Sequence, residues 1–489
     1  MLADMQLAAL MGSDLPPLSE GGATEIAGLT ADSREVKPGF LFAALPGTRV
    51  DGTRFIPQAI AQGAAAILVS TGADVGAGVP VIADSNPRRR LALMAARFFG
   101  KQPRTVVAVT GTNGKTSIVT FVRQIWTSLG HEAASLGTVG VVTARGERPL
   151  GHTTPDPVTL QAGLAELADE GVTHLAMEAS SHGLAQFRLD GVKIAAAAFT
   201  NITRDHLDYH HTFDDYAYSK LRLFGEVMAP GGVAVLNADA EHYAEFEAVS
   251  WARGHRVISI GRRGRDICLL GTKPTARGQA LELVHDGRNY NVNLPLIGGF
   301  QASNALVAAG LVIGCGGQPA RVFAALETIR GAKGRLEEVA HLPNGASIYV
   351  DYAHTPDALM NLLEAMRPHT ARRLVVVFGC GGDRDPGKRP QMGEAAARLA
   401  DKVYVTDDNP RSEDPASIRA AIIAAAPGAI EIGDRAAAIE AATRDLRAGD
   451  VLVIAGKGHE TGQIVGTRTI HFSDHEAIEA AVRRIGGAQ

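Results

Sequence analysis

Short apolar runs alternate with stretches of helical periodicity along most of the chain. The β-branched, apolar run Thr105–Thr110 is typical of a buried strand. After it, apolar residues three or four positions apart over 118–129 mark one face of a helix that ends at Gly130. Repetition of this strand-then-helix order predicts α/β domains with largely parallel sheets.

The same pattern divides the chain into three units. The glycine-rich stretch Gly331–Gly334 is typical of a linker, so we place one boundary there and another near Pro103. A length of 489 residues agrees with this division, since domains contain roughly 150 residues each. We therefore predict an N-terminal domain (residues 1–102), a central domain (103–333) and a C-terminal domain (334–489).

Within these units the apolar runs place the strands, and one capping signal places a helix. That helix begins at Asn86–Pro87, because Asn can cap a first turn and Pro suits the first helical position. We interpret Arg88–Arg90 as a solvent-exposed face of this helix and assign it no role. Strands are expected at Gly39–Leu45, Ala65–Ser70 and Val79–Ala83 in the first unit, and at Ser347–Tyr352, Leu374–Phe378, Lys402–Thr406 and Val451–Ala455 in the third.

Composition excludes several classes of protein. With 46% hydrophobic and 20% charged residues, the chain is neither disordered nor collagen-like. A net charge of −4 argues against a dedicated nucleic-acid binder. Three widely spaced cysteines form neither a disulfide framework nor a zinc motif, which fits a reducing compartment. No apolar run is long enough to span a membrane and residues 1–20 lack a secretory pattern, so we expect a cytoplasmic protein without membrane insertion.

A glycine-rich loop lies between the strand Thr105–Thr110 and the following helix. In this context glycines let backbone N–H groups converge on phosphate oxygens, while Lys115 reaches the outer phosphates and Thr116 can bind Mg²⁺. The strict P-loop pattern has glycine where this chain has Val109, and the alternative is a chance turn with a surface lysine. We predict that ATP is bound by Gly111, Thr112, Asn113, Gly114, Lys115, Thr116 and Ser117.

Several motifs together resemble one known family. The loop Thr110–Ser117 resembles the ATP loop of the Mur ligases, the ATP-dependent amide-forming enzymes of peptidoglycan synthesis, whose architecture folylpolyglutamate synthetases share. Five further segments agree with the family in the same order along the chain, which is more specific than any one motif. These segments are His152–Asp156, Met177–Leu184, Asn201–Asp208, Asp351–Pro356 and Gly382–Asp385.

The resemblance implies a three-domain α/β ligase. The N-terminal domain would hold the UDP end of the substrate, the central P-loop domain ATP, and the Rossmann-like C-terminal domain an amino acid. In the family, ATP phosphorylates a substrate carboxylate, an amine attacks the acyl phosphate, and phosphate leaves. Because the carboxylate and the triphosphate are both anionic, Mg²⁺ is expected as cofactor, at two sites, with ATP as the co-substrate.

The resemblance also implies metal ligands: Thr116, Glu178, His206 and Lys220. Apart from the family, Glu178 could cap the following helix, His206 could be an ordinary hydrogen-bonding histidine, and Lys220 could be an exposed helix lysine. In the family the lysine that matches Lys220 is carbamylated, so that a cation becomes an anion able to support the second metal site.

Two further sets of residues would bind the nucleotide and the UDP substrate. Asn304, Arg335 and Asp351 resemble contacts to adenosine or phosphate, and the last two require the third unit to close over the central one. Hydroxyl, amide and guanidinium groups suit the substrate UDP-N-acetylmuramoyl-L-alanyl-D-glutamate, although Ser33 alone could be a plain loop hydroxyl. This second set comprises Ala31, Ser33, Thr48, Arg49, Val50, His152, Thr153, Thr154, Ser180, Gln186 and Arg188.

The run Asp408–Arg411, followed by Gly456–Glu460, resembles the family members that add meso-diaminopimelate. This amino acid differs from lysine by a distal carboxylate, which the Arg411 guanidinium can bind with two hydrogen bonds and which lysine lacks. Arg384 could hold a carboxylate as well, and Asp408 or Glu460 could receive an ammonium group. The alternative for Arg411 is a purely structural ion pair with Asp408. The implied set is Arg384, Asp408, Asn409, Pro410, Arg411, Gly456 and Glu460.

Other functions stay open at this point. The same ligation could use L-lysine or another amine. A nucleotide-dependent switch or motor would hydrolyse ATP without forming a bond, but the chain shows no Walker B and arginine-finger pairing beyond Glu178. A catalytically dead binding module would not need Lys115, Glu178 and Lys220 together. We expect small-molecule partners only, no nucleic acid, and a monomer.

Overall fold

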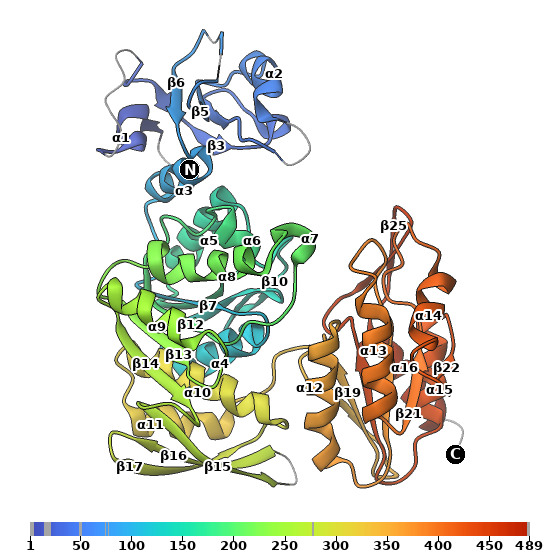
Figure 1. The fold of residues 1–489 in the computed structure, drawn as a ribbon. Coiled ribbons are helices and arrows are strands. Elements are labelled where there is room, and N and C mark those ends of the chain that lie inside the picture. The colour runs from blue at the N-terminus through green and yellow to red at the C-terminus, as the bar shows by residue number, and fades with distance from the viewer. Residues whose placement is uncertain are drawn as a thin grey trace.

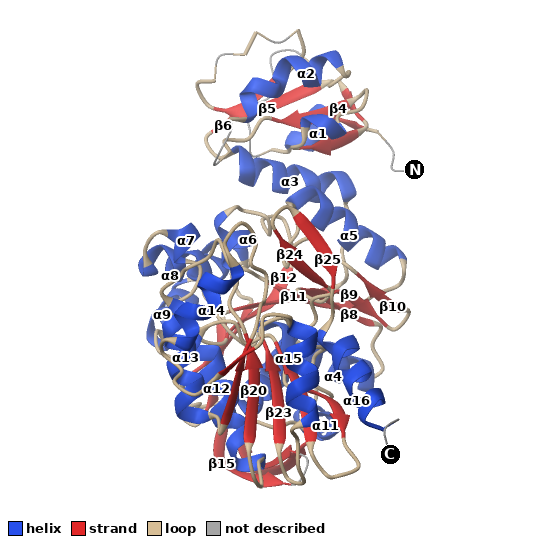
Figure 2. Cartoon of the chain, turned by 90° about the vertical axis from the view of Figure 1, so that its right-hand side faces the viewer, coloured by secondary structure: helices blue, strands red, loops and turns tan. Residues whose placement is uncertain are grey.

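Three α/β domains make up the protein. The computed structural model describes residues 4–13, 21–47, 51–73, 75–76, 78–275 and 278–486. In Figure 1 the N-terminal domain lies above the central domain and the C-terminal domain lies beside it. Figure 2 shows the same arrangement from the side of the C-terminal domain, with α3 (Pro87–Phe99) between the upper two domains.

The N-terminal domain is a small parallel sheet covered by short helices. Its strand order is β3-β4-β5-β6, and apolar residues on the two faces of the sheet form separate cores. Besides the pair β1 (Met5–Gln6) and β2 (Glu25–Ile26), the elements are β3 (Gly28–Thr30), β4 (Phe40–Ala43), β5 (Ala66–Ser70), β6 (Val81–Asp84), α1 (Leu7–Met11) and α2 (Ile56–Ala61). The three strands expected from the sequence are therefore present, with no end shifted by more than two residues.

Helix α3 begins as the sequence predicts, but its arginines do not form a solvated face. Asn86 caps the helix by accepting a hydrogen bond from the Arg89 backbone N–H. Arg90 is buried, with its Nε 2.7 Å from Asp84 Oδ2. Arg89 Nε lies 3.1 Å from the buried Asp190 carboxylate of the central domain. The predicted exposed face is therefore wrong for Arg90, which pairs with Asp84 at the helix start, whereas Arg89 reaches Asp190 while its side chain stays half exposed.

The central domain is built on a mixed, mostly parallel sheet. Its strand order is β10-β9-β8-β11-β7-β12-β13-β14-β15-β16-β17. The strands are β7 (Thr105–Thr110), β8 (Ala133–Gly137), β9 (Gly140–Thr143), β10 (Gly146–Arg148), β11 (His174–Glu178), β12 (Ile194–Phe199), β13 (Val233–Asn237), β14 (Arg256–Gly261), β15 (Ile267–Thr275), β16 (Gly278–His285) and β17 (Arg288–Leu294).

Strand β7 is buried on both faces, as expected for the middle of a parallel sheet. Val107 and Val109 face the core under α4, α10 and α11, whereas Val106 and Ala108 face the core under α5, α6 and α8. The helices are α4 (Lys115–Ser128), α5 (Pro157–Asp169), α6 (Ser181–Ala185), α7 (Leu207–His210), α8 (Phe213–Arg222), α9 (Tyr243–Ala252), α10 (Gly299–Gly314) and α11 (Pro319–Ala325).

The C-terminal domain has a six-stranded sheet of order β18-β19-β23-β20-β21-β22, parallel except for β18. Helices α12, α13 and α14 cover one face, and α15 and α16 cover the other. The elements are β18 (Glu337–His341), β19 (Ser347–Asp351), β20 (Leu374–Phe378), β21 (Lys402–Val405), β22 (Ile430–Glu431), β23 (Val451–Ala455), α12 (Pro356–Met366), α13 (Lys388–Leu399), α14 (Pro415–Ile423), α15 (Arg435–Arg444), α16 (Asp474–Gly486) and the hairpin β24 (Gly462–Val465) and β25 (Arg468–His471).

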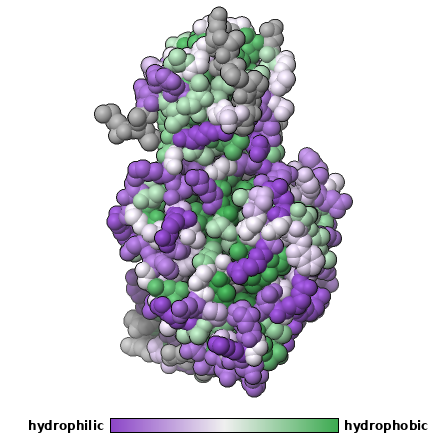
Figure 3. Space-filling model, turned by 90° about the vertical axis from the view of Figure 1, so that its left-hand side faces the viewer, coloured by the Kyte–Doolittle hydropathy of each residue, from purple (hydrophilic) through white to green (hydrophobic). Residues whose placement is uncertain are grey.

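On the face shown in Figure 3, hydrophilic residues predominate and hydrophobic ones form separate patches. None of the helices in the described part of the chain has the length and apolar character needed to cross a bilayer.

A fully buried ion pair fastens the terminal helix α16 to α15. Arg435 Nε and Nη2 lie 2.7 and 2.8 Å from the two Asp474 carboxylate oxygens. Arg435→Met leaves that carboxylate buried and unpaired, so we expect the free energy of unfolding to fall by about 3–5 kcal/mol in urea denaturation. As a control, Arg444→Gln removes an exposed pair with Glu440 and should change it by less than about 0.5 kcal/mol. Equal effects of the two substitutions would contradict this prediction.

Candidate active site

The main cavity lies where the central and C-terminal domains meet. It has a volume of about 460 Å³ and is lined from both sides, by the P-loop and by the start of α12. Four parallel strands of the central sheet, β8, β11, β7 and β12, end at this cavity. Glu178 is the last residue of β11, and Thr138, Gly111 and Thr200 directly follow β8, β7 and β12. The carboxyl ends of parallel strands are the usual place for a ligand in such sheets.

The loop between β7 and α4 has the backbone geometry of a phosphate loop. Gly111 has φ of 150°, and a Cβ there would lie 1.9 Å from Thr200 Oγ1. Gly114 has φ of 90° and immediately precedes α4. Val109, which departs from the strict pattern, belongs to the buried strand, so the turn begins two residues later, at Gly111. Of the predicted ATP residues, all except Gly111 line the cavity.

The Lys115 side chain folds back onto this loop. Its Nζ donates hydrogen bonds to the backbone oxygens of Gly111 and Thr112, at 2.7 and 2.8 Å. Burial lowers the pKa of Lys115 because an ammonium loses its hydration there, while the Glu178 carboxylate opposes that shift. A triphosphate in the cavity would offer this ammonium stronger, anionic acceptors.

Gly114 provides a sharp test of the loop. An alanine Cβ at this position would lie 2.4 Å from Asn304 Oδ1, another cavity residue. We expect Gly114→Ala to raise the KM for ATP by about tenfold, since both the loop and its Asn304 neighbour must shift. Gly130→Ala is the matched control, with the same φ of 90° at the other end of α4 and no atom within 4 Å of the added Cβ. A similar KM for both variants would contradict a phosphate role for this loop.

The C-terminal side of the cavity supplies Arg335 and Asp351. Arg335 Nη2 donates to Thr116 Oγ1 at 3.3 Å, and its guanidinium lies 4.3 Å from the centre of the Tyr352 ring. Asp351 ends β19 and accepts backbone hydrogen bonds from Leu336 and Ala353 at 2.6 and 2.7 Å. Burial raises the pKa of Asp351, although Arg335 opposes that shift. These residues close over the P-loop, as the resemblance implies.

Glu178 lies next to the P-loop because β11 and β7 are neighbours, with Glu178 opposite Val109. It is fully buried, and its carboxylate accepts hydrogen bonds from Thr138 N and Oγ1 at 2.8 and 3.1 Å. The helix-capping alternative is wrong, because Ser180 caps α6 by accepting from Gly183 N at 3.1 Å. The Glu178 carboxylate therefore faces the cavity.

Lys220 is a buried lysine of α8, so the alternative of an exposed helix lysine is wrong. Its side chain is only 1% exposed, and Nζ donates to Gly111 O at 3.0 Å. Nζ also lies 4.3 Å above the Tyr216 ring. Burial and the nearby Lys115 ammonium lower the pKa of Lys220 well below its usual value.

His206 lines the same cavity from the loop before α7. It has φ of 53°, and its Nε2 lies 3.5 Å from the Asp205 carboxylate. Burial lowers the pKa of His206, against the pull of Asp205. A neutral imidazole keeps a ring nitrogen lone pair, which is the form that ligates a metal.

The cavity's donor set fits a hard divalent cation. Thr116 Oγ1 and the Glu178 carboxylate offer oxygen donors of the kind Mg²⁺ prefers, beside the loop where phosphate oxygens would lie. Within the described ranges, no three His, Cys, Asp or Glu side chains are arranged to hold a metal by themselves. Water molecules and phosphate oxygens would complete the coordination, as is usual for Mg²⁺.

The central-domain residues expected to bind the UDP substrate are largely joined to one another. Thr154 Oγ1 donates to Glu178 O and accepts from Ser180. Arg188 Nη1 donates to Thr154 O at 2.6 Å, and its Nη2 donates to Gln186 at 2.7 Å. Thr153 lines the cavity with Ser180.

The remaining residues of that set lie apart from this network. His152 is exposed on a loop of the central domain. Ser33 lies in the N-terminal domain, where its hydroxyl donates to Gln58 at 3.3 Å, and the nearby Ala31 is exposed. The predicted contacts Thr48, Arg49 and Val50 fall outside the described residues.

The residues expected to bind the amino acid meet at one edge of the C-terminal sheet. Gly382 follows β20, Asp408–Arg411 follow β21, and Gly456–Glu460 follow β23. Asp351 ends β19 at the same edge and lines the main cavity. The amino-acid set therefore lies beside that cavity without lining it. Arg384 is exposed, and donates to Asp383 O at 3.4 Å.

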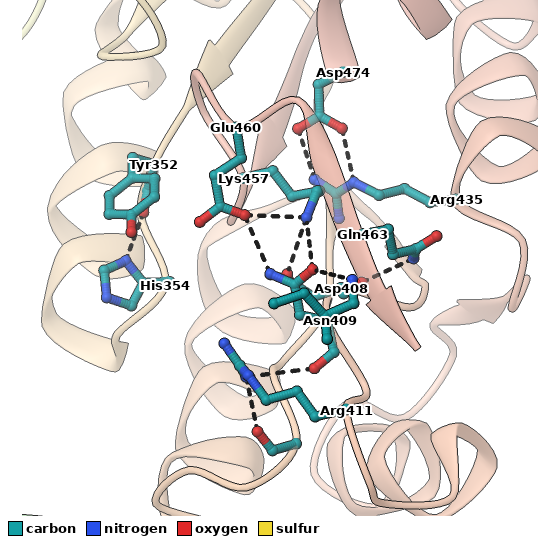
Figure 4. A network of polar contacts seen from close by, with 12 residues as sticks. Tyr352, His354, Asp408, Asn409, Arg411, Arg435, Lys457, Glu460, Gln463 and Asp474 are labelled. Atoms are coloured by element: carbon teal, nitrogen blue, oxygen red, sulfur yellow. Dashed lines mark hydrogen bonds and ion pairs between the residues drawn. The ribbon is translucent and has the colours of Figure 1, made fainter. Parts of the chain in front are cut away.

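Arg411 has no carboxylate partner in the described part of the chain. Its Nη1 donates to the backbone oxygens of Gly382 and Asn409, at 2.8 and 3.4 Å. Asp408 instead lies 3.7 Å from the Lys457 ammonium, so the alternative of a structural Arg411–Asp408 ion pair is wrong. Figure 4 shows the Arg411 guanidinium and Glu460 on the side of the network that faces Tyr352.

Comparisons with known proteins agree with this geometry. Models of the Mur ligase family catalytic domain, the Mur ligase middle domain and the Mur ligase glutamate ligase domain match residues 25–99, 109–312 and 334–458. The UDP-N-acetylmuramoyl-L-alanyl-D-glutamate–2,6-diaminopimelate ligase of Bradyrhizobium diazoefficiens is 56% identical, over 98% of this chain and 99% of its own. The chain belongs to the Mur ligase family.

Other relatives of this Mur ligase are similar over nearly the whole length. The enzyme of the same name from Caulobacter vibrioides is 57% identical over 92% of this chain and 94% of its own. A solved structure of a UDP-N-acetylmuramoyl-L-alanyl-D-glutamate–2,6-diaminopimelate ligase superposes with a TM-score of 0.73 at 32% identity, covering 99% of this chain and 100% of that one. The three-domain fold expected from the sequence is thereby confirmed.

Sequence analysis of this Mur ligase missed several residues that shape the site. Thr138 holds Glu178, and Asp357 at the start of α12 accepts from Asn113 of the P-loop at 3.3 Å. Asp357 directly follows the motif Asp351–Pro356, which is a signal that could have found it. Lys457 lies inside Gly456–Glu460 but had no assigned role.

Proposed function

We propose that this Mur ligase joins meso-diaminopimelate to the D-glutamate γ-carboxylate of UDP-N-acetylmuramoyl-L-alanyl-D-glutamate in peptidoglycan synthesis, at the expense of ATP. The observation that carries the choice of amino acid is the Arg411 guanidinium, which donates to backbone oxygens, forms no ion pair with a carboxylate among the described residues, and lies on the same side of the network as the Glu460 carboxylate (Figure 4). This pair can bind one carboxylate and one ammonium group, as the distal end of meso-diaminopimelate requires. The names of the similar enzymes support the same substrates.

Residues of the P-loop and of the C-terminal domain would position the phosphates. We propose that Lys115 leaves its backbone acceptors for the outer phosphates, and that Arg335 reaches them from the opposite side. The substrate carboxylate then attacks the γ-phosphorus, ADP leaves, and an acyl phosphate forms. The amine, once its ammonium form has lost a proton, attacks the acyl carbon. The C–O bond to phosphate then breaks, the nitrogen loses a second proton, and the amide and inorganic phosphate remain.

We propose two Mg²⁺ sites, at Thr116 with Glu178 and at His206 with Lys220. Mg²⁺ bound there would neutralise phosphate charge that otherwise repels the substrate carboxylate. As an ammonium, Lys220 cannot ligate a cation. A neutral Lys220 amine can bond to the carbon of CO₂ and lose one proton, giving a carbamate anion, and its burial beside Lys115 supports that neutral form.

The other assignments rest on placement in the fold. Thr153, Thr154, Ser180, Gln186 and Arg188 would hold the dipeptide end of the substrate near Glu178, and Ser33 the UDP end. We propose domain boundaries near residues 102 and 333, because each of them separates the strands of one sheet from the strands of the next along the chain. A cytoplasmic monomer with no nucleic-acid partner completes the proposal.

Phosphate release with each substrate omitted in turn tests this function. We expect release only when ATP, Mg²⁺, UDP-N-acetylmuramoyl-L-alanyl-D-glutamate and meso-diaminopimelate are all present. L-lysine in place of meso-diaminopimelate should give little release, because its side chain offers Arg411 no carboxylate. Release that needs neither the UDP substrate nor an amine would instead favour a nucleotide-dependent switch.

A further inference from the structure

We propose that Lys457 is a positioning residue for the amino-acid site: it holds Asn409 and Glu460 in their binding orientation and neutralises Asp408, which therefore contacts no substrate. This inference rests on the proposed function and adds that the acidic residues Asp408 and Glu460 have different roles in it.

Lys457 is fully buried at the carboxyl end of β23, where the proposed amino-acid set converges. Its Nζ donates to Asn409 Oδ1 at 3.0 Å and to Glu460 Oε2 at 3.1 Å, and lies 3.7 Å from Asp408 Oδ1 (Figure 4). A buried ammonium is costly unless it is paired and hydrogen-bonded, and these three groups meet that need. Lys457 thus contacts, from their buried side, the two loops that follow β21 and β23.

The two carboxylates beside Lys457 differ in exposure. The Asp408 side chain is 8% exposed and that of Glu460 is 32% exposed. Glu460 is therefore the more accessible of the two carboxylates for an ammonium group of a ligand. Asp408 is the buried counter-charge of Lys457. This leaves Glu460, of the two acidic residues Asp408 and Glu460, to bind the ammonium group of the amino acid.

Lys457 also fixes the amide of Asn409. Asn409 Oδ1 accepts from Lys457 Nζ and from Ile464 N at 2.9 Å, so its Nδ2 is the atom that donates to Glu460, at 3.1 Å. The backbone oxygen of Asn409 in turn accepts from Arg411 Nη1. A change at Lys457 should therefore disturb Glu460 and Arg411 together, while leaving the nucleotide cavity intact.

Steady-state kinetics of Lys457→Met tests the inference. We expect the KM for meso-diaminopimelate to rise at least about tenfold, with the KM for ATP and for the UDP substrate changed less than about twofold. Lys457→Met with Asp408→Asn removes the uncompensated charge and should show the same selective rise even if the single variant folds poorly. Lys402→Met is the matched control, since Lys402 pairs with Asp445 at the opposite end of the sheet, and it should leave all three KM values unchanged.

Each outcome decides the question. A folded Lys457 variant with the wild-type KM for meso-diaminopimelate would overturn the inference, as would a parallel rise in all three KM values. Failure of both variants to fold would assign Lys457 to stability and overturn it as well. Wild-type protein that does not use meso-diaminopimelate would instead refute the proposed function, and that result is separate because it needs no variant.

Discussion

Lys220→Ala is expected to lower kcat for ligation at least about a hundredfold while the protein stays folded. Lys220 reaches the P-loop from α8 through its contact with Gly111 O. Alanine cannot form a carbamate, so the anion proposed to support the second Mg²⁺ site is lost. The measurement is phosphate release under saturating substrates, with circular dichroism to verify the fold.

Chemical rescue separates a carbamate from a merely structural lysine. Excess bicarbonate with a short carboxylic acid should partly restore activity to Lys220→Ala, because a free carboxylate can occupy the vacated space. Lys193→Ala, an exposed lysine of the same domain, is the control and should behave as wild type. Full activity of Lys220→Ala without rescue would rule out this role.

Arg411→Ala should raise the KM for meso-diaminopimelate by at least about tenfold, because a charged hydrogen bond contributes roughly 1.5–3 kcal/mol. The guanidinium has backbone oxygens as its hydrogen-bond acceptors, so its removal leaves no buried carboxylate unpaired. The KM for ATP should stay close to wild type. Selectivity against L-lysine should fall as well, since the unpaired guanidinium no longer disfavours it.

Arg384→Ala is the comparison for this prediction, because Arg384 belongs to the same predicted set but is exposed and donates to the Asp383 backbone oxygen. We expect it to raise the KM for meso-diaminopimelate less than Arg411→Ala does. An unchanged KM in Arg411→Ala would refute the assignment of Arg411 to the substrate carboxylate.

Local sequence patterns were enough to predict much of the fold and the P-loop. Strand β7 coincides with the expected Thr105–Thr110, because a β-branched run before glycines has few other solutions in a parallel sheet. The strands at Leu374–Phe378 and Val451–Ala455 are likewise confirmed. In each case the signal lies within a short stretch of chain.

Contacts that form only in the folded chain account for what the sequence could not predict. A run of three arginines does not show that Arg90 turns back to Asp84 at the end of β6. The sequence also leaves Asp408 open to pair with Arg411, three residues away, whereas in the fold it lies 3.7 Å from Lys457 of the loop after β23. The sequence likewise does not show that Thr138 donates a hydrogen bond to Glu178, which lies forty positions later in the chain.

The mass of the reaction product tests the central claim most directly. The purified protein would be incubated with ATP, Mg²⁺, UDP-N-acetylmuramoyl-L-alanyl-D-glutamate and an equimolar mixture of meso-diaminopimelate and L-lysine. We predict one new species, whose mass equals that of the UDP substrate plus meso-diaminopimelate minus water, with ADP and phosphate formed alongside. A product that contains lysine, or ATP hydrolysis with no new UDP-linked species, would contradict the account.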